Sequence, residues 1–414
     1  MPERCHRRTT CRLCGGQALS RVLSLAPTPP ANAFVSEDSL SEPQQCYPLD
    51  VFLCRDCAHG QLLDVVDPSV LFEDYVYVSG TSPVFVEHFS RYAESIIRRF
   101  QPAAGGLVLD IGSNDGTLLR FFGEAGYRTL GVDPAREIAR KANEAGIETM
   151  VEFFTSRLAQ AIGRERGPAQ VITANNVFAH VDDLADVTRG IKSLLAPAGV
   201  FAAEVSYLVD VVEKTLFDII YHEHLSYHTV APLQRFLSAQ GLELIEAIRI
   251  ATHGGSIRFI AQHAGGPYPV GQSVGEALEL ERDLGFDTDA PYRALERRIS
   301  TLKSRLGELL GRLKADGATI AGFGAPAKAT TLMYHFGIGP QTIDFIVDDS
   351  PWKQGLYTPG LHIPVLPAAA IYERKPDYVI ILAWNFAPAI MEKHAGFRQA
   401  GGHFIVPIPE IEVH

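Results

Sequence analysis

The chain has 414 residues, more than one ordinary hydrophobic core can hold, so two or three domains are expected. Its 46% of hydrophobic and 21% of charged residues describe a soluble globular protein, and the net charge of −11 excludes a general binder of nucleic acid, which needs a cationic face. Because no apolar run approaches the roughly 20 residues of a membrane span and the first residues lack the apolar part of a signal peptide, we expect a cytoplasmic protein without membrane contact.

Two C-x-x-C pairs stand near the start of the chain, and their thiols belong to Cys11, Cys14, Cys54 and Cys57. Four thiolates from two such pairs can surround Zn²⁺ tetrahedrally. Reduced surface cysteines or a redox pair are the alternative, but a double pair seldom arises by chance. His59 could replace one thiolate, and Cys5 or Cys46 could be a spare. We predict a structural zinc site on which this small domain depends to fold.

An aromatic stretch containing Tyr75 and Tyr77 precedes a predicted amphipathic helix from Pro83 to Phe100. Core packing is the commoner role of such tyrosines. Their position just ahead of the next unit would nevertheless let one of them cover a site in that unit.

A short apolar run from Leu107 to Ile111 predicts a buried strand that leads into a glycine-containing turn. The strand carries Asp110, and Gly112 lets the backbone turn tightly and approach a ligand. A helix that opens at Thr117 points its N-terminus at the same place. An ordinary strand–turn–helix without a ligand is the alternative.

A second predicted strand ends in Asp133, one helix further along the chain. Two acidic strand ends separated by one helix suit a ligand with ribose hydroxyls. The run V-L-D-I-G-S-N-D-G followed by L-G-V-D resembles the cofactor motif of class I S-adenosylmethionine methyltransferases, with Asn114 where many members carry another glycine.

Further strands are predicted at residues 171–178 and 200–205, and a closing strand pair at residues 242–250 and 256–263. In a doubly wound sheet, ligands bind outside the carboxyl ends of the strands. This rule collects five polar side chains on one edge, those of Asp110, Asp133, Asn175, His180 and Glu204.

The connection over residues 206–240 is inserted between two strands of this sheet and should fold over the same edge. It contains Tyr-His-Glu-His-Leu-Ser-Tyr-His at residues 221–228, polar groups that are costly to bury unless they are paired. We expect them above the bound cofactor. If the run is helical, Tyr221, His224 and His228 share one face. A metal site is the alternative, but the spacing lacks the H-E-x-x-H pattern of zincins.

The composition shifts beyond residue 265. An amphipathic helix is predicted from Pro291 to Lys314, and a second α/β unit then opens with G-F-G-A-P-A-K at residues 322–328. This glycine turn fits the looser dinucleotide fingerprint, with Asp348 at a suitable distance, so an NAD site is one reading. Pro326 stands within the expected helix start, and a phosphate-bearing substrate could use the same turn with Lys328 as counter-charge.

These pieces, in this order, resemble the S-adenosylmethionine-dependent sugar C-methyltransferases that act on nucleotide-linked ketodeoxysugars. The blocks that carry the resemblance are the paired knuckles, the methyltransferase motif, Y-H-E-H, T-H-G-G-S-I-R, G-F-G-A-P-A-K and V-D-D-S-P-W-K-Q-G. The resemblance implies an α/β chain with a zinc-binding domain at residues 1–68, a class I methyltransferase domain with a Rossmann-like sheet at 69–265, and a second Rossmann-like domain at 266–414. A nucleotide sugar would bind between the last two domains, and the oligomeric state is left open.

The resemblance also implies roles for single residues. The catalytic positions match Tyr75, His180, Tyr221, Glu223 and His224. The expected cofactor contacts are Asp110, Gly112, Asp133 and Asn175. The expected substrate contacts are Lys328 and His253.

Carbon methylation explains why such residue types are needed. A sugar carbon becomes a nucleophile only when a proton beside a ketone is removed, which makes an enolate. His224, with an expected near-neutral pKa, would remove the proton, while Tyr221 or His180 would stabilise the oxyanion and Glu223 would orient His224 or a sugar hydroxyl. Methylation of oxygen or nitrogen is the nearest alternative; a zinc-ribbon binding module and an NAD-dependent oxidoreductase are more distant ones.

Overall fold

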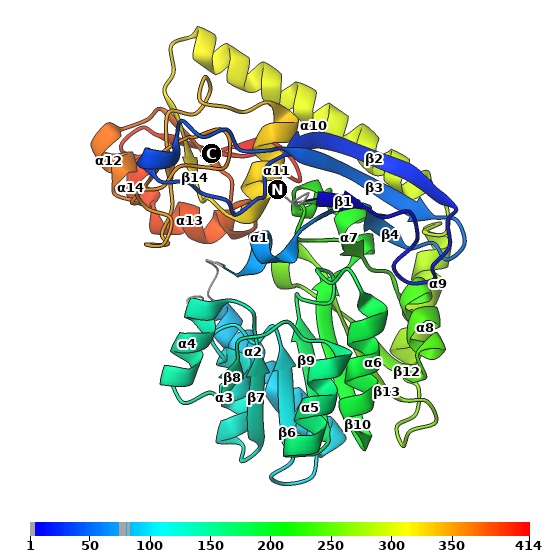
Figure 1. Ribbon diagram of the computed structural model, residues 1–414. Helices are drawn as coiled ribbons and strands as arrows, with labels where there is room; N and C mark the ends of the chain where they lie inside the picture. Colours follow the sequence, from blue (N-terminus) through cyan, green and yellow to red (C-terminus); the bar gives the residue numbers. More distant parts are fainter. Residues whose placement is uncertain (1–4, 74–79, 81–82) are drawn as a thin grey trace.

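The computed structural model describes residues 5–73, 80 and 83–414, apart from the side chains of Pro83 and His253. Figure 1 shows a central α/β unit at the bottom, with an N-terminal sheet and a C-terminal α/β unit beside each other above it. No helix in the described part is both long enough and apolar enough to cross a membrane.

The central unit is built on a seven-stranded sheet with the order β12-β13-β10-β9-β6-β7-β8. Its strands are β6 (Leu107–Ile111), β7 (Arg128–Val132), β8 (Thr149–Met150), β9 (Ala169–Asn175), β10 (Leu195–Ser206), β12 (Leu242–Ile250) and β13 (Ser256–His263). The strands from β6 to β10 run parallel, whereas β13 and β12 pair antiparallel at one end. The predicted Rossmann-like sheet with a closing strand pair is confirmed.

Helices cover both faces of this sheet, which is why β6 is apolar and buried throughout. Val108 packs with α2 (Pro83–Phe100) and α3 (Thr117–Glu124) on one face. Leu109 packs with α5 (Ser156–Arg166) and α6 (Leu184–Leu194) on the other face. The unit also contains α4 (Arg136–Glu144) and α8 (Val230–Ala239), and α9 (Gln272–Asp283) packs against α8 and β12.

The N-terminal sheet has the order β11-β4-β3-β2, and one of its strands comes from the middle of the chain. Its strands are β2 (Leu19–Thr28), β3 (Tyr47–Cys54), β4 (Gly60–Leu62) and β11 (Ser226–Tyr227). Around it lie the strand pair β1 (Cys5–Arg7) and β5 (Asp64–Val66), with η1 (Glu37–Ser39) and α1 (Pro68–Phe72). The connection that supplies β11 also contains α7 (Leu208–Glu213) and η3 (Phe217–Ile219), so it ties the N-terminal unit to the histidine run.

The C-terminal unit has a six-stranded sheet with the order β16-β15-β14-β17-β18-β19, parallel except for β19. Its strands are β14 (Ile320–Phe323), β15 (Ile346–Val347), β16 (Val365–Leu366), β17 (Tyr378–Ile381), β18 (His403–Val406) and β19 (Glu412–Val413). Its helices are α10 (Ala290–Ala315), α11 (Ala327–Phe336), α12 (Ala370–Arg374), η5 (Trp384–Phe386), α13 (Ala387–Lys393) and α14 (Ala395–Gln399). This is the predicted second Rossmann-like unit.

The N-terminal unit is held against the C-terminal one by packing and by hydrogen bonds. β2 packs against α10, which crosses the top of the molecule in Figure 1, and against α11. Thr330 Oγ1 donates to the carbonyl of Ala31 at 3.1 Å, and the N–H of Ala26 donates to His335 Nδ1 at 3.1 Å. The three units therefore form one interlocked body around the rim of the central sheet.

Candidate active site

The glycine turn after β6 contains left-handed residues and is closed by a carboxylate. Gly112 (φ +67°) and Asn114 (φ +52°) both have positive φ, a region that asparagine tolerates better than most side chains, so it can replace the glycine of the motif. The N–H groups of Asn114 and Ala135 each donate to one oxygen of Asp133, both at 2.8 Å. The carboxylate is thereby fixed beside the turn, although burial raises its pKa.

Asp110 and Asn175 lie on the adjacent strands β6 and β9. The hydroxyl of Thr173 donates to Asp110 Oδ1 at 2.6 Å, and burial raises the pKa of this carboxyl to about 7. Asn175 ends β9, and within the described residues neither atom of its buried amide group has a hydrogen-bond partner. Buried amides are rarely left unpaired, so Asn175 fits a contact with polar atoms of a bound cofactor.

Three aromatic side chains that the sequence singled out gather at the same edge. The ring centres of His180 and His224 are 5.0 Å apart, and those of Tyr221 and His224 are 4.2 Å apart. Phe72, from α1, stacks on His180 with 5.4 Å between the ring centres. The inserted connection thus folds over the rim and brings these predicted catalytic residues together.

A hydrogen bond at His224 decides which ring nitrogen can accept a proton. Nδ1 lies 2.6 Å from the carbonyl oxygen of Ile219, and only a protonated Nδ1 can donate to it. The lone pair of the neutral ring is therefore on Nε2. Burial lowers the pKa of His224 to about 4, against the opposing effect of the Ile219 carbonyl. The expectation of a near-neutral pKa is wrong for this reason, and the imidazole stays neutral well below pH 6.5.

His180 is held as a neutral imidazole. Burial, and secondarily the neighbouring His224, lower its pKa well below the ordinary value. Its Nε2 is buried and has no hydrogen-bond partner within the described part of the chain. A neutral imidazole carries one N–H donor and one acceptor nitrogen, so His180 can donate to a ligand oxygen or accept from a ligand hydroxyl.

Glu223 is buried and contacts the N-terminal unit. Asn32 donates through Nδ2 to Glu223 Oε1 at 2.7 Å. Burial lowers the pKa of Lys353, and the charges of Asp348 and Glu223 oppose this effect. Lys353 donates through Nζ to the carbonyl of Ala325 at 2.7 Å. The sequence did not single out Asn32 or Lys353 as neighbours of Glu223, because only the packing of the three units brings these residues together. For Lys353 the one signal was the block V-D-D-S-P-W-K-Q-G.

The C-terminal glycine turn repeats the arrangement of the central one. Asp348 accepts the N–H groups of Ala325 at 2.6 Å and Ser350 at 2.7 Å, much as Asp133 is held beside the first turn. Lys328 donates to Asn385 Oδ1 at 2.6 Å and lies over the indole ring of Trp384 at 4.0 Å. Burial lowers the pKa of Lys328, and the charge of Asp218 opposes this effect.

Two predicted site residues lie outside the described structure. Tyr75 belongs to residues 74–79, which are not described. His253 lies in η4 (Thr252–Gly254), but its side chain is outside the description.

The histidine run is a turn followed by a short strand, so the helical arrangement weighed for it is wrong. Ser226 and Tyr227 pair with β4, and this strand pairing outweighs any local helix preference. The ring of His228 lies between those of His59 and Phe178, with centre distances of 5.4 and 5.7 Å. His222 packs edge-on against Tyr47. Within the described residues, no histidine of the run joins a group of three or more metal-ligating side chains.

Glu204 lies level with Asn175 on the neighbouring strand, but its carboxylate is already paired. Arg258 donates through Nε to Glu204 Oε1 at 2.6 Å, and His88 Nε2 lies 2.8 Å from Oε2. Glu204 therefore lies at the predicted edge of the sheet, and α2 and β13 supply two partners that bury its carboxylate in an ion-paired group.

The four knuckle cysteines form one compact cluster. Their sulfur atoms all lie within 4.8 Å of one another, with Cys11 to Cys57 and Cys14 to Cys54 at 3.6 Å. A tetrahedral site with Zn–S bonds of about 2.3 Å needs sulfur atoms about 3.8 Å apart, so the donor set fits zinc. Within the described residues His59 does not belong to this group, and its Nε2 lies 3.1 Å from the hydroxyl of Ser226.

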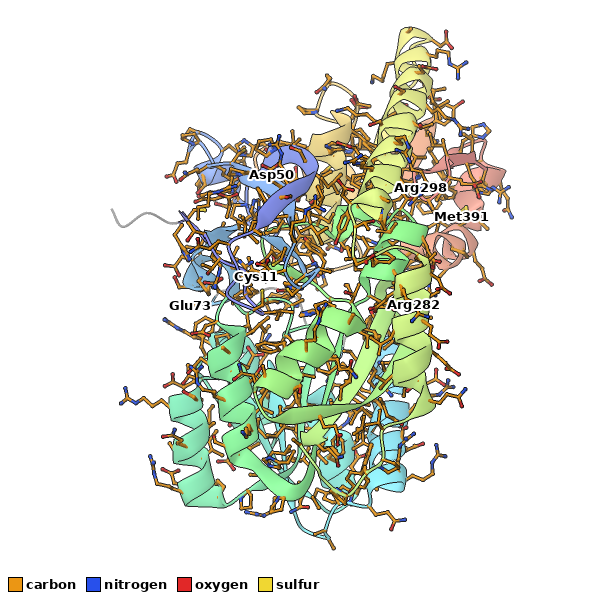
Figure 2. All side chains as sticks on the ribbon, turned by 90° about the vertical axis from the view of Figure 1, so that its right-hand side faces the viewer. Cys11, Asp50, Glu73, Arg282, Arg298 and Met391 are labelled. Atoms are coloured by element: carbon orange, nitrogen blue, oxygen red, sulfur yellow. The ribbon has the colours of Figure 1, made fainter. Side chains whose placement is uncertain are left out.

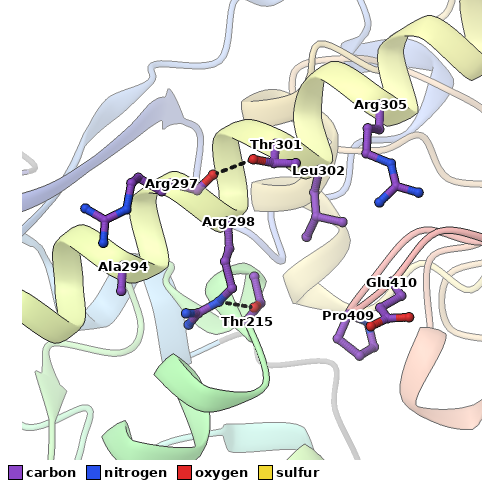
Figure 3. A pocket seen from close by; sticks show the side chains of 9 residues that line it. All are labelled: Thr215, Ala294, Arg297, Arg298, Thr301, Leu302, Arg305, Pro409 and Glu410. Atoms are coloured by element: carbon purple, nitrogen blue, oxygen red, sulfur yellow. Dashed lines mark hydrogen bonds between the residues drawn. The ribbon is translucent and has the colours of Figure 1, made fainter. Parts of the chain in front are cut away.

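A separate groove of about 470 Å³ lies beside α10 (Figure 3). Arg298 forms part of its wall and donates to Thr215 Oγ1 at 3.0 Å, while Pro409 and Glu410 lie across from it. None of the predicted site residues that the structure describes lines this groove, so the site is argued from the geometry of the rim.

We expect Gly112→Ala to weaken binding of S-adenosylmethionine roughly tenfold, because a left-handed residue with a side chain costs about 1–3 kcal/mol. The added Cβ would also lie 2.2 Å from Val177 Cγ2, so the turn would have to shift. Titration calorimetry measures the affinity. Gly123→Ala is the matched control, because its added Cβ would meet nothing closer than 3.9 Å. Equal affinities in the two variants would contradict the assignment of this turn.

Three family descriptions match the chain in order. They are "Putative zinc binding domain" over residues 11–72, "Methyltransferase domain" over residues 85–247 and "C-methyltransferase C-terminal domain" over residues 251–409. The first match includes all four clustered cysteines, and the second includes the glycine turn, His180 and His224.

Similar proteins include C-methyltransferase NovU of Streptomyces niveus, which is 37% identical over 97% of this chain and 96% of its own length. A ubiquinone biosynthesis O-methyltransferase of Ralstonia nicotianae is 33% identical over 25% of this chain and 44% of its own length. Among solved structures, magnesium protoporphyrin IX methyltransferase of Synechocystis with bound SAH is 15% identical, with a TM-score of 0.34 over 43% of this chain and 83% of that one.

Proposed function

Since this chain belongs to the S-adenosylmethionine-dependent C-methyltransferase family, we propose that it methylates a nucleotide-linked 4-keto-deoxysugar, with dTDP as the nucleotide, at a carbon next to the ketone. The observation that most supports this reaction is the state of His224. Its ring is neutral, and the Ile219 carbonyl leaves Nε2 with the lone pair at the sheet rim. Such a nitrogen can take a proton from a carbon acid.

In this proposal His224 Nε2 removes the proton beside the ketone. The enolate oxygen then needs a donor, and His180 or Tyr221 supplies it, since both rings lie against that of His224. The negative charge that develops on the substrate raises the basicity of the buried imidazole during the step. Glu223 is proposed to accept a hydrogen bond from a sugar hydroxyl or to orient His224. Tyr75, which lies outside the described residues, is the proposed cover of the site.

Asp110, Gly112, Asp133 and Asn175 hold the cofactor in this proposal. When bound there, S-adenosylmethionine supplies an electrophilic methyl group for the activated carbon. Lys328 and His253 are the proposed substrate contacts, and Lys328 offers its ammonium group to a diphosphate. The zinc cluster lies in a different part of the fold, so we assign it a structural role.

Deuterium exchange tests the carbanion step. We expect the enzyme with S-adenosylhomocysteine, in D₂O, to exchange the proton beside the ketone of a dTDP-linked 4-keto-6-deoxysugar faster than buffer does, as followed by NMR. An enzyme that methylates oxygen or nitrogen needs no carbanion and would leave that proton in place. Failure of exchange, together with methylation of a hydroxyl or amine, would replace our proposal by that alternative.

A further inference from the structure

Arg12 stands between Cys11 and Cys14 in the first zinc knuckle, yet its side chain is directed to the catalytic rim. The side chain is fully buried, and Nε donates to Asp182 Oδ1 at 3.1 Å. One terminal nitrogen donates to the carbonyl of Leu62 and also lies 3.4 Å from the carbonyl of Leu225. Figure 2 shows Cys11 where the N-terminal strands meet the central unit.

Besides Gln61 and Leu62 of β4, the side chain of Arg12 has one partner in each of the two loops that carry the proposed catalytic imidazoles. Leu225 follows His224 directly, and Asp182 lies two residues after His180. The N–H groups of Leu225 and Ser226 both donate to the carbonyl of Ala179, at 2.9 and 3.0 Å. The two loops therefore touch at Ala179, and Arg12 bonds to both sides of this contact.

Burying a guanidinium group is costly unless several acceptors surround it, and burial lowers the pKa of Arg12 to about 10. Joining the N-terminal unit to Asp182 does not by itself require a buried guanidinium group, because Arg8 already makes that connection. Arg8 NH1 donates to the backbone carbonyl of Asp182 at 3.1 Å and to its Oδ1 at 3.0 Å. Among the described residues, the side chain of Arg8 has hydrogen bonds to Thr10 and Asp182 and none to the loop that carries His224.

We propose that Arg12 is a positioning residue, which uses the zinc knuckle as a rigid base to hold the His180 and His224 loops at their catalytic separation. This inference depends on the proposed roles of the two histidines. A displacement of about 1 Å between catalytic groups can reduce a rate roughly a hundredfold, so a single guanidinium can matter at this distance from the chemistry.

The test compares Arg12→Gln, Arg12→Lys and the control Arg8→Gln. With the dTDP-linked 4-keto-6-deoxysugar as substrate, we expect kcat to fall roughly 10- to 100-fold in Arg12→Gln, with the KM of S-adenosylmethionine almost unchanged. Arg12→Lys should recover part of kcat, because it restores a charged donor beside Asp182. Arg8→Gln should keep most of the wild-type kcat, and all variants should keep one zinc per chain.

A readout without substrate separates this inference from the proposed function. Hydrogen exchange followed by mass spectrometry should show faster exchange of residues 221–229 in Arg12→Gln, with unchanged exchange in residues 107–111 and unchanged zinc. Wild-type kcat, or exchange like that of Arg8→Gln, would overturn the role of Arg12. If Arg12→Gln does not fold, Asp182→Asn takes its place: a fall in kcat beyond that of Arg8→Gln supports the inference, and an equal kcat overturns it.

Discussion

Replacing His224 with alanine should abolish methyl transfer and leave S-adenosylmethionine binding intact. A positioned general base contributes typically 10²- to 10⁴-fold to a rate, so we expect kcat to fall by about that factor. The nearest proposed alternative base is His180, but its pKa is also lowered well below the ordinary value and its ring would lose its neighbour. Single-turnover kinetics with labelled methyl donor measure the loss, and calorimetry measures the cofactor affinity.

The neighbouring His222 offers a control for this variant. Its Nε2 lies 3.2 Å from the carbonyl of Pro48, so it serves the packing of the N-terminal unit. His222→Asn should lower the melting temperature while the folded enzyme keeps most of its kcat. Normal turnover by His224→Ala would remove the base from our mechanism, and loss of cofactor binding in that variant would assign His224 to binding instead.

Cys54→Ser should lose zinc and unfold the N-terminal unit. Structural zinc sites contribute about 10–16 kcal/mol in small domains, which is as large as the whole stability of an ordinary domain. The loss should spread to the loop that carries His224, because β11 pairs with β4 and the carbonyl of Leu225 accepts the N–H of Leu62 at 2.9 Å. Methyl transfer should therefore disappear together with the metal, although no proposed catalytic group is changed.

Metal analysis, thermal denaturation and limited proteolysis would measure this effect. Cys46→Ser is the matched control, because Cys46 is exposed and lies outside the sulfur cluster. It should retain zinc and the wild-type melting temperature. A Cys54→Ser protein that keeps both one zinc per chain and its melting temperature would contradict the predicted role of the cluster.

Structural features that depend only on neighbouring residues in the sequence were predictable. The glycine turn after β6, the strand that ends at Asp133 and the cysteine knuckles each depend on spacing within a few residues, and the structure contains all three. The long amphipathic α10 was predictable for the same reason, since its buried leucines recur with the period of a helix.

Features that depend on distant partners were not predictable. Nothing near Ser226 reveals that it will pair with β4, and this pairing makes a strand where a helix was considered. Glu204 lies at the predicted edge of the sheet, but nothing near it in the sequence reveals that Arg258 and His88 pair with its carboxylate. The contact of Asn32 with Glu223 joins residues far apart in the chain, and no periodic pattern records it.

The pairing of β11 with β4 also has a consequence for biosynthesis. A ribosome releases the N-terminal strands and both knuckles long before it releases Ser226 and Tyr227, so a nascent chain that has captured its metal still presents β4 as an open edge. Open strand edges are templates for pairing with other chains. Translation therefore passes through an interval in which this edge has no native partner and is exposed to aggregation.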